Sequence, residues 1–178
     1  GDRGQMQEAQ NLNGHIGKIV RVTETGTVPA NNPFRGQAGA RPEIFSLGNR
    51  NVQGAALHPV TGELWAHEHG PQGGDEVNII RPGRNYGWPV ITYGVNYGIG
   101  TKIGEGTAKA GMEQPLWKWV PSIAPSGMTF YTGDRFPKWK GNLFVGALAG
   151  QTIARLTLDG DTVVREERIK GTGRTRDL

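Results

Sequence analysis

Cysteine is absent from the 178 residues of the sequence. Its absence excludes disulfide bonds, thiolate catalysis and metal sites built on sulfur. No apolar run approaches the roughly 18 residues that a membrane-spanning helix needs, so no membrane span is predicted. No signal peptide is visible either, although a targeting segment could lie outside this sequence if it is a piece of a longer chain.

A strong excess of charge of either sign is also missing. Twenty Lys and Arg residues against 16 Asp and Glu residues give a net charge of +4. Basic residues cluster only near the end of the sequence, where acidic residues interrupt them. The cluster consists of Arg165, Arg168, Lys170, Arg174 and Arg176. A small anionic ligand fits this pattern better than a nucleic acid does, so no nucleic-acid partner is predicted.

Glycine is abundant, with 29 residues, and 11 prolines accompany it. No Gly-x-y period is present, which excludes collagen, and no amphipathic helix is evident. Short alternating segments between glycine-rich turns predict an all-β chain. We expect strands at 18–23, 43–46, 53–58, 63–67, 76–80, 116–120, 127–131, 142–147, 152–158 and 162–169. Asp159 and Gly160 give the last two segments a hairpin signal.

Two units of the sequence share one order of segments. QGAALHP, GELWAHE and DEVNIIRPGRNYG in the first correspond to SGMTFYT, GNLFVGA and QTIARLTLDGD in the second. Repeated four-strand units without helices predict a β-propeller, although a two-sheet sandwich could produce the same periodicity. The chain holds about three blades, which cannot close a ring and would expose unpaired edges. We therefore expect the remaining blades on a segment outside this sequence or on another chain.

The segment NRNVQG places Arg50 and Asn51 directly before a predicted strand. An arginine there can stabilise negative charge on a carbonyl oxygen or bind a planar anion through two hydrogen bonds. A surface arginine beside an asparagine turn gives the same pattern. The sequence WAHEHGPQGGDE follows and concentrates histidines and acids in a glycine-rich loop.

In that loop His67 and His69 share one face of a strand, a spacing that could suit zinc. The HExxH spacing is absent, and oxygen ligands for a hard cation such as calcium are better represented. These oxygens come from Glu68, Asp75 and Glu76 and from the backbone carbonyls of Gly70 and Pro71. A charged turn without a metal remains an equal alternative.

Aromatic residues in GRNYGWP (83–89) can line a pocket or simply pack in the core. Other motifs are missing. The glycine-rich stretch 98–106 matches no phosphate-binding pattern, and no GxSxG elbow offers a hydrolase nucleophile.

SLGNRNVQG, EHGPQGGDEVNII and GRNYGWP, in this order and with short gaps, resemble the PQQ-dependent soluble aldose sugar dehydrogenases of the glucose/sorbosone dehydrogenase family. GDRGQ, NPF, EQP, SGM and FVGAL extend the likeness over nearly the whole chain. The resemblance implies that residues 1–178 form a single partial domain, the C-terminal half of a six-bladed β-propeller. It also implies oxidation of aldose sugars to lactones with pyrroloquinoline quinone (PQQ) and calcium.

The resemblance further implies a periplasmic or secreted location, an external electron acceptor, and a missing N-terminal propeller half as a partner. By its match to the family, Arg50 is the catalytic residue of this chain, because it stabilises the anion formed on the quinone. The implied cofactor-binding residues are Arg50, Asn51, Tyr97, Leu148, Ala149, Gly150, Arg174 and Arg176. The implied calcium ligands are Gly70, Pro71, Glu76 and Tyr86.

Two departures from the family pattern affect these expectations. The family's general-base histidine belongs to the N-terminal half, so that role is not given to His67 or His69, and the chain alone is expected to be inactive. Relatives often carry a lysine where this sequence has Ala149, which removes one cofactor contact. Two rival functions remain, a calcium-dependent lactonase-type propeller and a non-catalytic binding module. Three arginines argue against the lactonase, since they suit a polyanion better than a neutral lactone.

Overall fold

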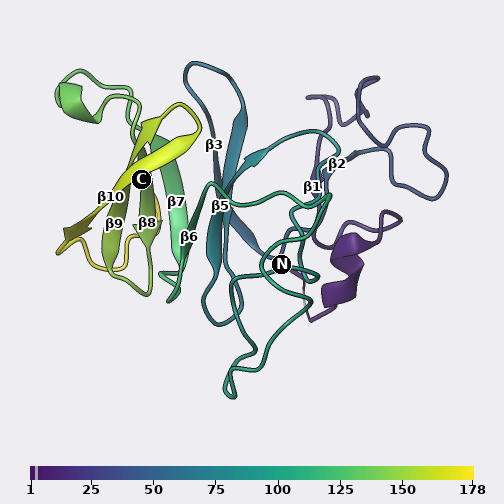
Figure 1. The fold of residues 1–178 in the computed structure, drawn as a ribbon. Helices are drawn as coiled ribbons and strands as arrows, with labels where there is room; N and C mark the ends of the chain where they lie inside the picture. The colour runs from purple at the N-terminus through teal and green to yellow at the C-terminus, as the bar shows by residue number, and fades with distance from the viewer. Residues whose placement is uncertain (3) are drawn as a thin grey trace.

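The computed structural model describes residues 1–2 and 4–178, and short antiparallel strands dominate that part of the chain (Figure 1). A two-stranded sheet comes first, followed by two four-stranded sheets. The strands are β1 (Ile19–Val20), β2 (Ile44–Ser46), β3 (Val52–Leu57), β4 (Leu64–Glu68), β5 (Asp75–Ile80), β6 (Trp117–Trp119), β7 (Pro125–Phe130), β8 (Leu143–Ala147), β9 (Thr152–Asp159) and β10 (Thr162–Lys170). Two short 3-10 helices, η1 (Met6–Gln10) and η2 (Pro137–Trp139), complete the elements, and the described residues contain no α-helix.

Each four-stranded sheet is a simple antiparallel meander. The strand orders are β3-β4-β5-β6 and β7-β8-β9-β10. The two sheets lie side by side, and their first strands, β3 and β7, are in contact (Figure 1). Equivalent meanders joined in this way are neighbouring blades, so the prediction of a partial β-propeller is confirmed. The two-stranded sheet belongs to a third, incomplete unit.

All ten expected strands occur in the described structure, but the first was predicted too long. Of residues 18–23 only Ile19 and Val20 are in β1, where the register against β2 shifts between them. After this point the backbone N–H of Thr23 donates to the carbonyl of Thr27 and closes a turn. Alternation along the sequence cannot reveal such a turn. The expected hairpin is confirmed, since Asp159 pairs with Thr162 at the tip of β9 and β10.

The main hydrophobic core fills the space between the two blades. Trp65 and Val77 from one blade and Leu143 and Leu156 from the other are fully buried there. Alternating burial along β9 shows why, because every second side chain points into this seam. The Trp65 ring packs edge-on against Phe130, with 5.3 Å between ring centres, and ties the blades together.

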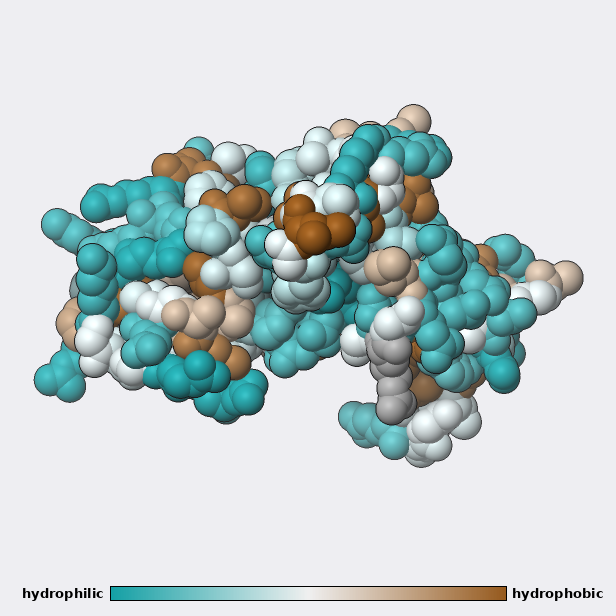
Figure 2. Space-filling view, turned by 90° about the horizontal axis from the view of Figure 1, so that it is seen from below, coloured by the Kyte–Doolittle hydropathy of each residue, from teal (hydrophilic) through white to brown (hydrophobic). Residues whose placement is uncertain are grey.

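The antiparallel order of the strands also places several loops of each blade at the same end. In an antiparallel blade the start of the first strand, the end of the second and the start of the third lie at one end. The long connection from β5 to β6 projects beyond the same end, seen at the bottom of Figure 1. Viewed from below, this end is mostly polar, with small separate apolar patches (Figure 2).

Candidate functional site

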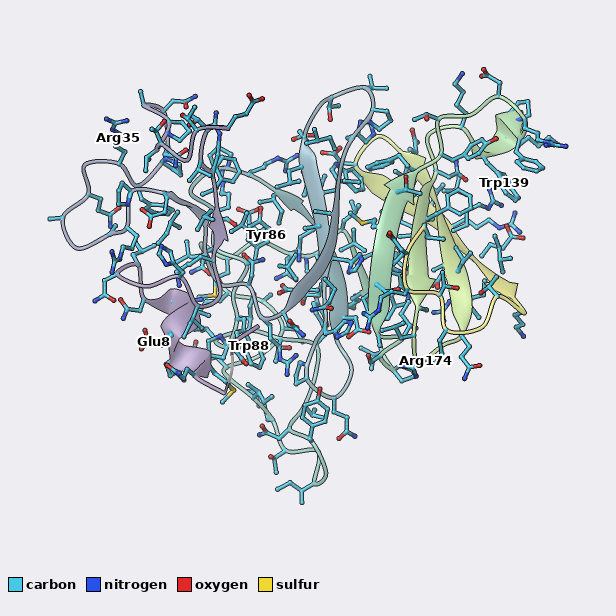
Figure 3. The ribbon with its side chains drawn as sticks, turned by 180° about the vertical axis from the view of Figure 1, so that it is seen from behind. Glu8, Arg35, Tyr86, Trp88, Trp139 and Arg174 are labelled. Atoms are coloured by element: carbon cyan, nitrogen blue, oxygen red, sulfur yellow. The ribbon has the colours of Figure 1, made fainter. Side chains whose placement is uncertain are left out.

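Most of the residues proposed for the site from the sequence are brought to this loop end of the blades. Arg50 and Asn51 precede β3, and Gly70 and Pro71 lie between β4 and β5. Residues 148–150 occupy the equivalent connection of the second blade, between β8 and β9, and the arginines of residues 174–176 follow β10. Figure 3 shows Trp88 and Arg174 at this same end, whereas Trp139 lies at the opposite one.

Arg50 is held on two sides. Its Nη1 donates to the carbonyl oxygens of His69, at 3.0 Å, and Gly70, at 2.7 Å. Its guanidinium also lies over the ring of Trp88, 5.2 Å from the ring centre. The Nε atom is buried and has no hydrogen-bond partner among the described residues. A fixed arginine with an unsatisfied buried donor is suited to an anionic ligand.

Glu68 fixes the backbone that carries Arg50. One oxygen of its buried carboxylate accepts hydrogen bonds from the backbone N–H groups of Arg50 and Asn51. The carbonyl of Asn51 in turn accepts from the N–H of His69, at 3.0 Å. The sequence suggested Glu68 only as a cation ligand. Its place at the end of β4, facing the start of β3, was the signal for this second role.

Glu68, which is buried, and Glu76, which is half-buried, form a pair of acids. They stand directly opposite each other where β4 pairs with β5. Burial raises the pKa of Glu68 to about 7, and burial together with repulsion from Glu68 raises the pKa of Glu76 to about 8. Like charges facing each other across a sheet are unfavourable, and the positive charges of Arg50 and Lys118 offset this repulsion only in part. A bound proton or cation would therefore stabilise the pair.

A small cavity of about 10 Å³ adjoins both acids, large enough for about one water or one ion. Tyr86 and Thr92 line it as well. The hydroxyl of Tyr86 is already engaged, since it donates to the carbonyl of Ile79 at 2.6 Å. The same hydroxyl also accepts from the N–H of Arg81 at 2.8 Å, so the backbone carbonyl of Tyr86 is the better candidate for a cation ligand. Two facing carboxylates, one buried and one half-buried, beside an ion-sized space fit a hard divalent cation.

The other proposed metal ligands are placed differently. The carbonyl of Gly70 accepts the Arg50 hydrogen bond, which leaves it one lone pair for a cation. Neither histidine of the loop joins the acids. His67 is fully buried, with its pKa lowered to about 4 by burial, and His69 Nε2 lies 2.7 Å from the carbonyl oxygen of Pro125. The described residues contain no cluster of three or more metal-type side chains, so carbonyl or water oxygens would have to complete any cation site.

The loop of residues 148–150 packs on the segment before β7. Its backbone N–H groups donate to the carbonyls of Ala124, at 3.0 Å, and Ile123, at 3.1 and 3.3 Å. Leu148 is half-buried, whereas Ala149 and Gly150 are exposed. The exposed backbone of this loop is therefore available to a ligand, but Ala149 offers it no charge.

Arg174 and Arg176 reach the site because the chain after β10 runs back along β7. The N–H of Gly127 donates to the carbonyl of Arg176 at 2.8 Å, and the hydroxyl of Ser126 donates to the carbonyl of Thr175 at 2.6 Å. A β-carbon built on Gly127 would lie 2.5 Å from Cα of Asp177, so only glycine leaves room for this segment. Both arginine side chains are exposed.

Tyr97 lies apart from the small cavity beside Arg50. It lies in the loop between β5 and β6, is 68% exposed and does not line the cavity beside Arg50. The loop is anchored at its base, where Gln72 and Val95 form an isolated β-bridge.

The Glucose / Sorbosone dehydrogenase family model matches residues 1–178. The aldose sugar dehydrogenase YliI of Escherichia coli (strain K12) is 48% identical over 171 residues, which are 95% of this chain and 46% of that protein. A crystal structure of glucose dehydrogenase has a TM-score of 0.95 and 52% identity, with 99% of this chain and 52% of that chain covered. The PQQ-bound aldose sugar dehydrogenase of Streptomyces coelicolor has a TM-score of 0.77 and 30% identity, covering 99% of this chain and 46% of that chain.

The chain spans about half the length of each of these relatives. Among the described residues there is no helix with the length and apolar character needed to traverse a bilayer.

Proposed function

The chain belongs to the glucose/sorbosone dehydrogenase family, and on this premise we propose that it forms half of the active site of a PQQ- and calcium-dependent aldose dehydrogenase. In this proposal residues 1–178 are a single partial domain, the C-terminal half of a six-bladed propeller. The observation that carries the proposal is that Arg50 and the arginine-bearing segment 174–176 come to one end of the blades.

The arginines suit the cofactor chemically. PQQ is a flat molecule with three carboxylates and a quinone, and guanidinium groups bind planar oxyanions through paired hydrogen bonds. Arg174 and Arg176 would bind the carboxylates, while the guanidinium of Arg50, whose buried Nε has no partner among the described residues, would stabilise negative charge on the quinone. Asn51, Tyr97 and the 148–150 loop supply the remaining contacts in this proposal.

The reaction proposed is oxidation of the anomeric carbon to a lactone. PQQ, when bound, supplies the acceptor for the hydride that leaves C1 of the sugar. Arg50 would stabilise the resulting negative charge, and its bonds to His69 and Gly70 keep it in place without reorganisation. The base that removes the anomeric hydroxyl proton is assigned to the half of the ring outside this chain.

Calcium is proposed at Glu76 and the backbone carbonyl of Tyr86, with Glu68 beside them, and at the carbonyls of Gly70 and Pro71. When bound, calcium supplies positive charge that neutralises carboxylates and polarises an oxygen ligand. The raised pKa values of both acids support the first position, because a cation there replaces protons. An external acceptor would take the electrons, in a periplasmic or secreted enzyme.

The test is calcium-dependent PQQ binding, followed by the cofactor's absorbance. It is made on residues 1–178 alone and on the full-length protein, meaning the chain joined to the blades that complete the ring. We expect binding and sugar-driven reduction only in the full-length protein. The double variant Arg174→Gln/Arg176→Gln should bind PQQ at least about tenfold more weakly, whereas Arg165→Gln, an exposed arginine of β10, should not change it.

Two outcomes would contradict the proposal. A folded, calcium-loaded full-length protein without PQQ affinity would favour a lactonase or a binding module instead. Sugar oxidation by the isolated 178 residues would show that this chain needs no second half.

A further inference from the structure

Asp75 is the most completely hydrogen-bonded side chain of the loop end. It is fully buried at the start of β5. Its Oδ1 accepts from the N–H of Gly70 at 2.9 Å, and its Oδ2 accepts from the hydroxyl of Ser122 at 2.6 Å. The same Oδ2 accepts from the N–H groups of Ile123, at 2.8 Å, and Ala124, at 3.0 Å.

Three of these four bonds cross the seam between blades. Gly70 belongs to the β4–β5 connection of the first blade, while residues 122–124 lead into β7 of the second. The carbonyls of Ile123 and Ala124 in turn hold the N–H groups of residues 148–150. The carboxylate of Asp75 therefore connects two loops, the β4–β5 connection that contacts Arg50 and the 148–150 loop. These loops are distant in sequence and belong to different sheets.

A carboxylate has the right shape and acceptor capacity for this arrangement. Four donors point at two oxygens, and an ionised carboxylate is an acceptor with about four lone-pair sites. An asparagine would turn an NH₂ group toward donors on one side, whichever way its amide were placed. The bond to Ala124 has a further role. Ala124 has a φ of 51°, a strained conformation for a residue other than glycine, and its N–H is held in place by Asp75.

We propose that Asp75 is a positioning residue that sets the geometry between the two cofactor-contacting loops without touching the cofactor itself. This inference rests on the proposed function, since that function makes Gly70 and residues 148–150 cofactor contacts. Asp75 acts through Gly70 on the loop that holds Arg50, and through Ile123 and Ala124 on residues 148–150. Loss of the carboxylate leaves both loops folded but no longer fixed relative to each other.

The experiment compares three variants of the full-length protein. Asp75→Asn removes the charge, Ser122→Ala removes one donor and provides a milder change should the first variant not fold, and Val145→Ala weakens the buried core of the neighbouring strand β8. The first readout is amide hydrogen exchange at residues 148–150 without cofactor. The second is the dissociation constant for PQQ, with the KM for sugar measured at saturating PQQ.

We expect faster exchange at residues 148–150 and about tenfold weaker PQQ binding in Asp75→Asn, with the KM for sugar little changed. Ser122→Ala should show the same changes to a smaller degree, and Val145→Ala should show neither at equal loss of thermal stability. Unchanged exchange at residues 148–150 in both Asp75→Asn and Ser122→Ala would overturn the inference whether or not PQQ binds. PQQ affinity equal to wild type would overturn it while leaving the proposed function intact. No PQQ binding to the wild type would refute the proposed function and the positioning role with it.

Discussion

Replacing Glu76 with glutamine should stabilise the calcium-free protein at neutral pH. Glu76 is half-buried and faces Glu68 across β4 and β5, and its pKa is raised to about 8 from an ordinary 4.5. A raised pKa means that the folded protein keeps a proton that the unfolded chain releases. Stability from this group is therefore complete below pH 4.5 and is lost as the pH rises toward 8.

The size of the loss follows from the two pKa values. At about 1.4 kcal/mol per pH unit, raising the pH from 4.5 to 7 lowers the free energy of unfolding by about 3 kcal/mol. Glutamine takes up no proton and keeps nearly the same shape, so this loss disappears. At pH 7 without calcium, Glu76→Gln should be more stable than wild type by up to about 3 kcal/mol, and near pH 4.5 the two should be equal.

The assay is urea unfolding of the full-length protein between pH 4.5 and 8, in a chelator and again with calcium. Calcium should reverse the ranking, because wild type gains binding energy that the glutamine variant lacks. The control is Glu105→Gln, which removes an exposed carboxylate paired with Lys109 and should not alter the pH dependence. Parallel pH profiles for wild type and Glu76→Gln would refute the reasoning about the pair of acids. Equal stabilisation of both proteins by calcium would refute the role of Glu76 as a ligand.

Two packing predictions concern the seam between the blades. Gly54→Ala should lower the free energy of unfolding by about 1–3 kcal/mol in urea titrations, because its β-carbon would lie 2.4 Å from Nε2 of His67 and 2.5 Å from the carbonyl oxygen of Ser126. Ala55→Ser, on the exposed face of the same strand, is its control. Leu143→Ala should cost about 2–5 kcal/mol in the same titration, since the side chain is fully buried. A cost no larger than that of Leu158→Ala at the partly buried rim would contradict the assignment of the core.

The strands were predictable because alternation and turn residues act locally. β9 and β10 are an example, with a hairpin signal at Asp159 and strict alternation in β9. The first strand was predicted too long because non-local contacts end it. The side-chain amide of Asn32 donates to the carbonyl of Arg21, and a turn between Thr23 and Thr27 follows.

The residues of the candidate site could be predicted from the sequence, but most of the contacts between them could not. The acids and arginines could be named from their motifs, since charge and loop position are visible in sequence. The pairing of Glu68 with Glu76 was not predictable from the expected strands 63–67 and 76–80, because their ends would place His67 opposite Glu76. In the structure β4 runs on to Glu68 and β5 begins at Asp75, which sets the observed register. The four bonds of Asp75 could not be predicted either, since three of their donors come from the next blade.

The effect assigned to a substitution of Gly127 in a mutational scan will depend on the property that the scan measures. The residue bears no ligand-binding group, yet the space above it is what admits the segment carrying Arg174 and Arg176. A scan scored by abundance registers it as one more tight packing position in β7. Under the proposed function, a scan scored by cofactor binding would group Gly127 with Arg174 and Arg176. The two scans would therefore disagree at Gly127, because the β-carbon that this residue lacks would occupy the space of the segment that carries the arginines.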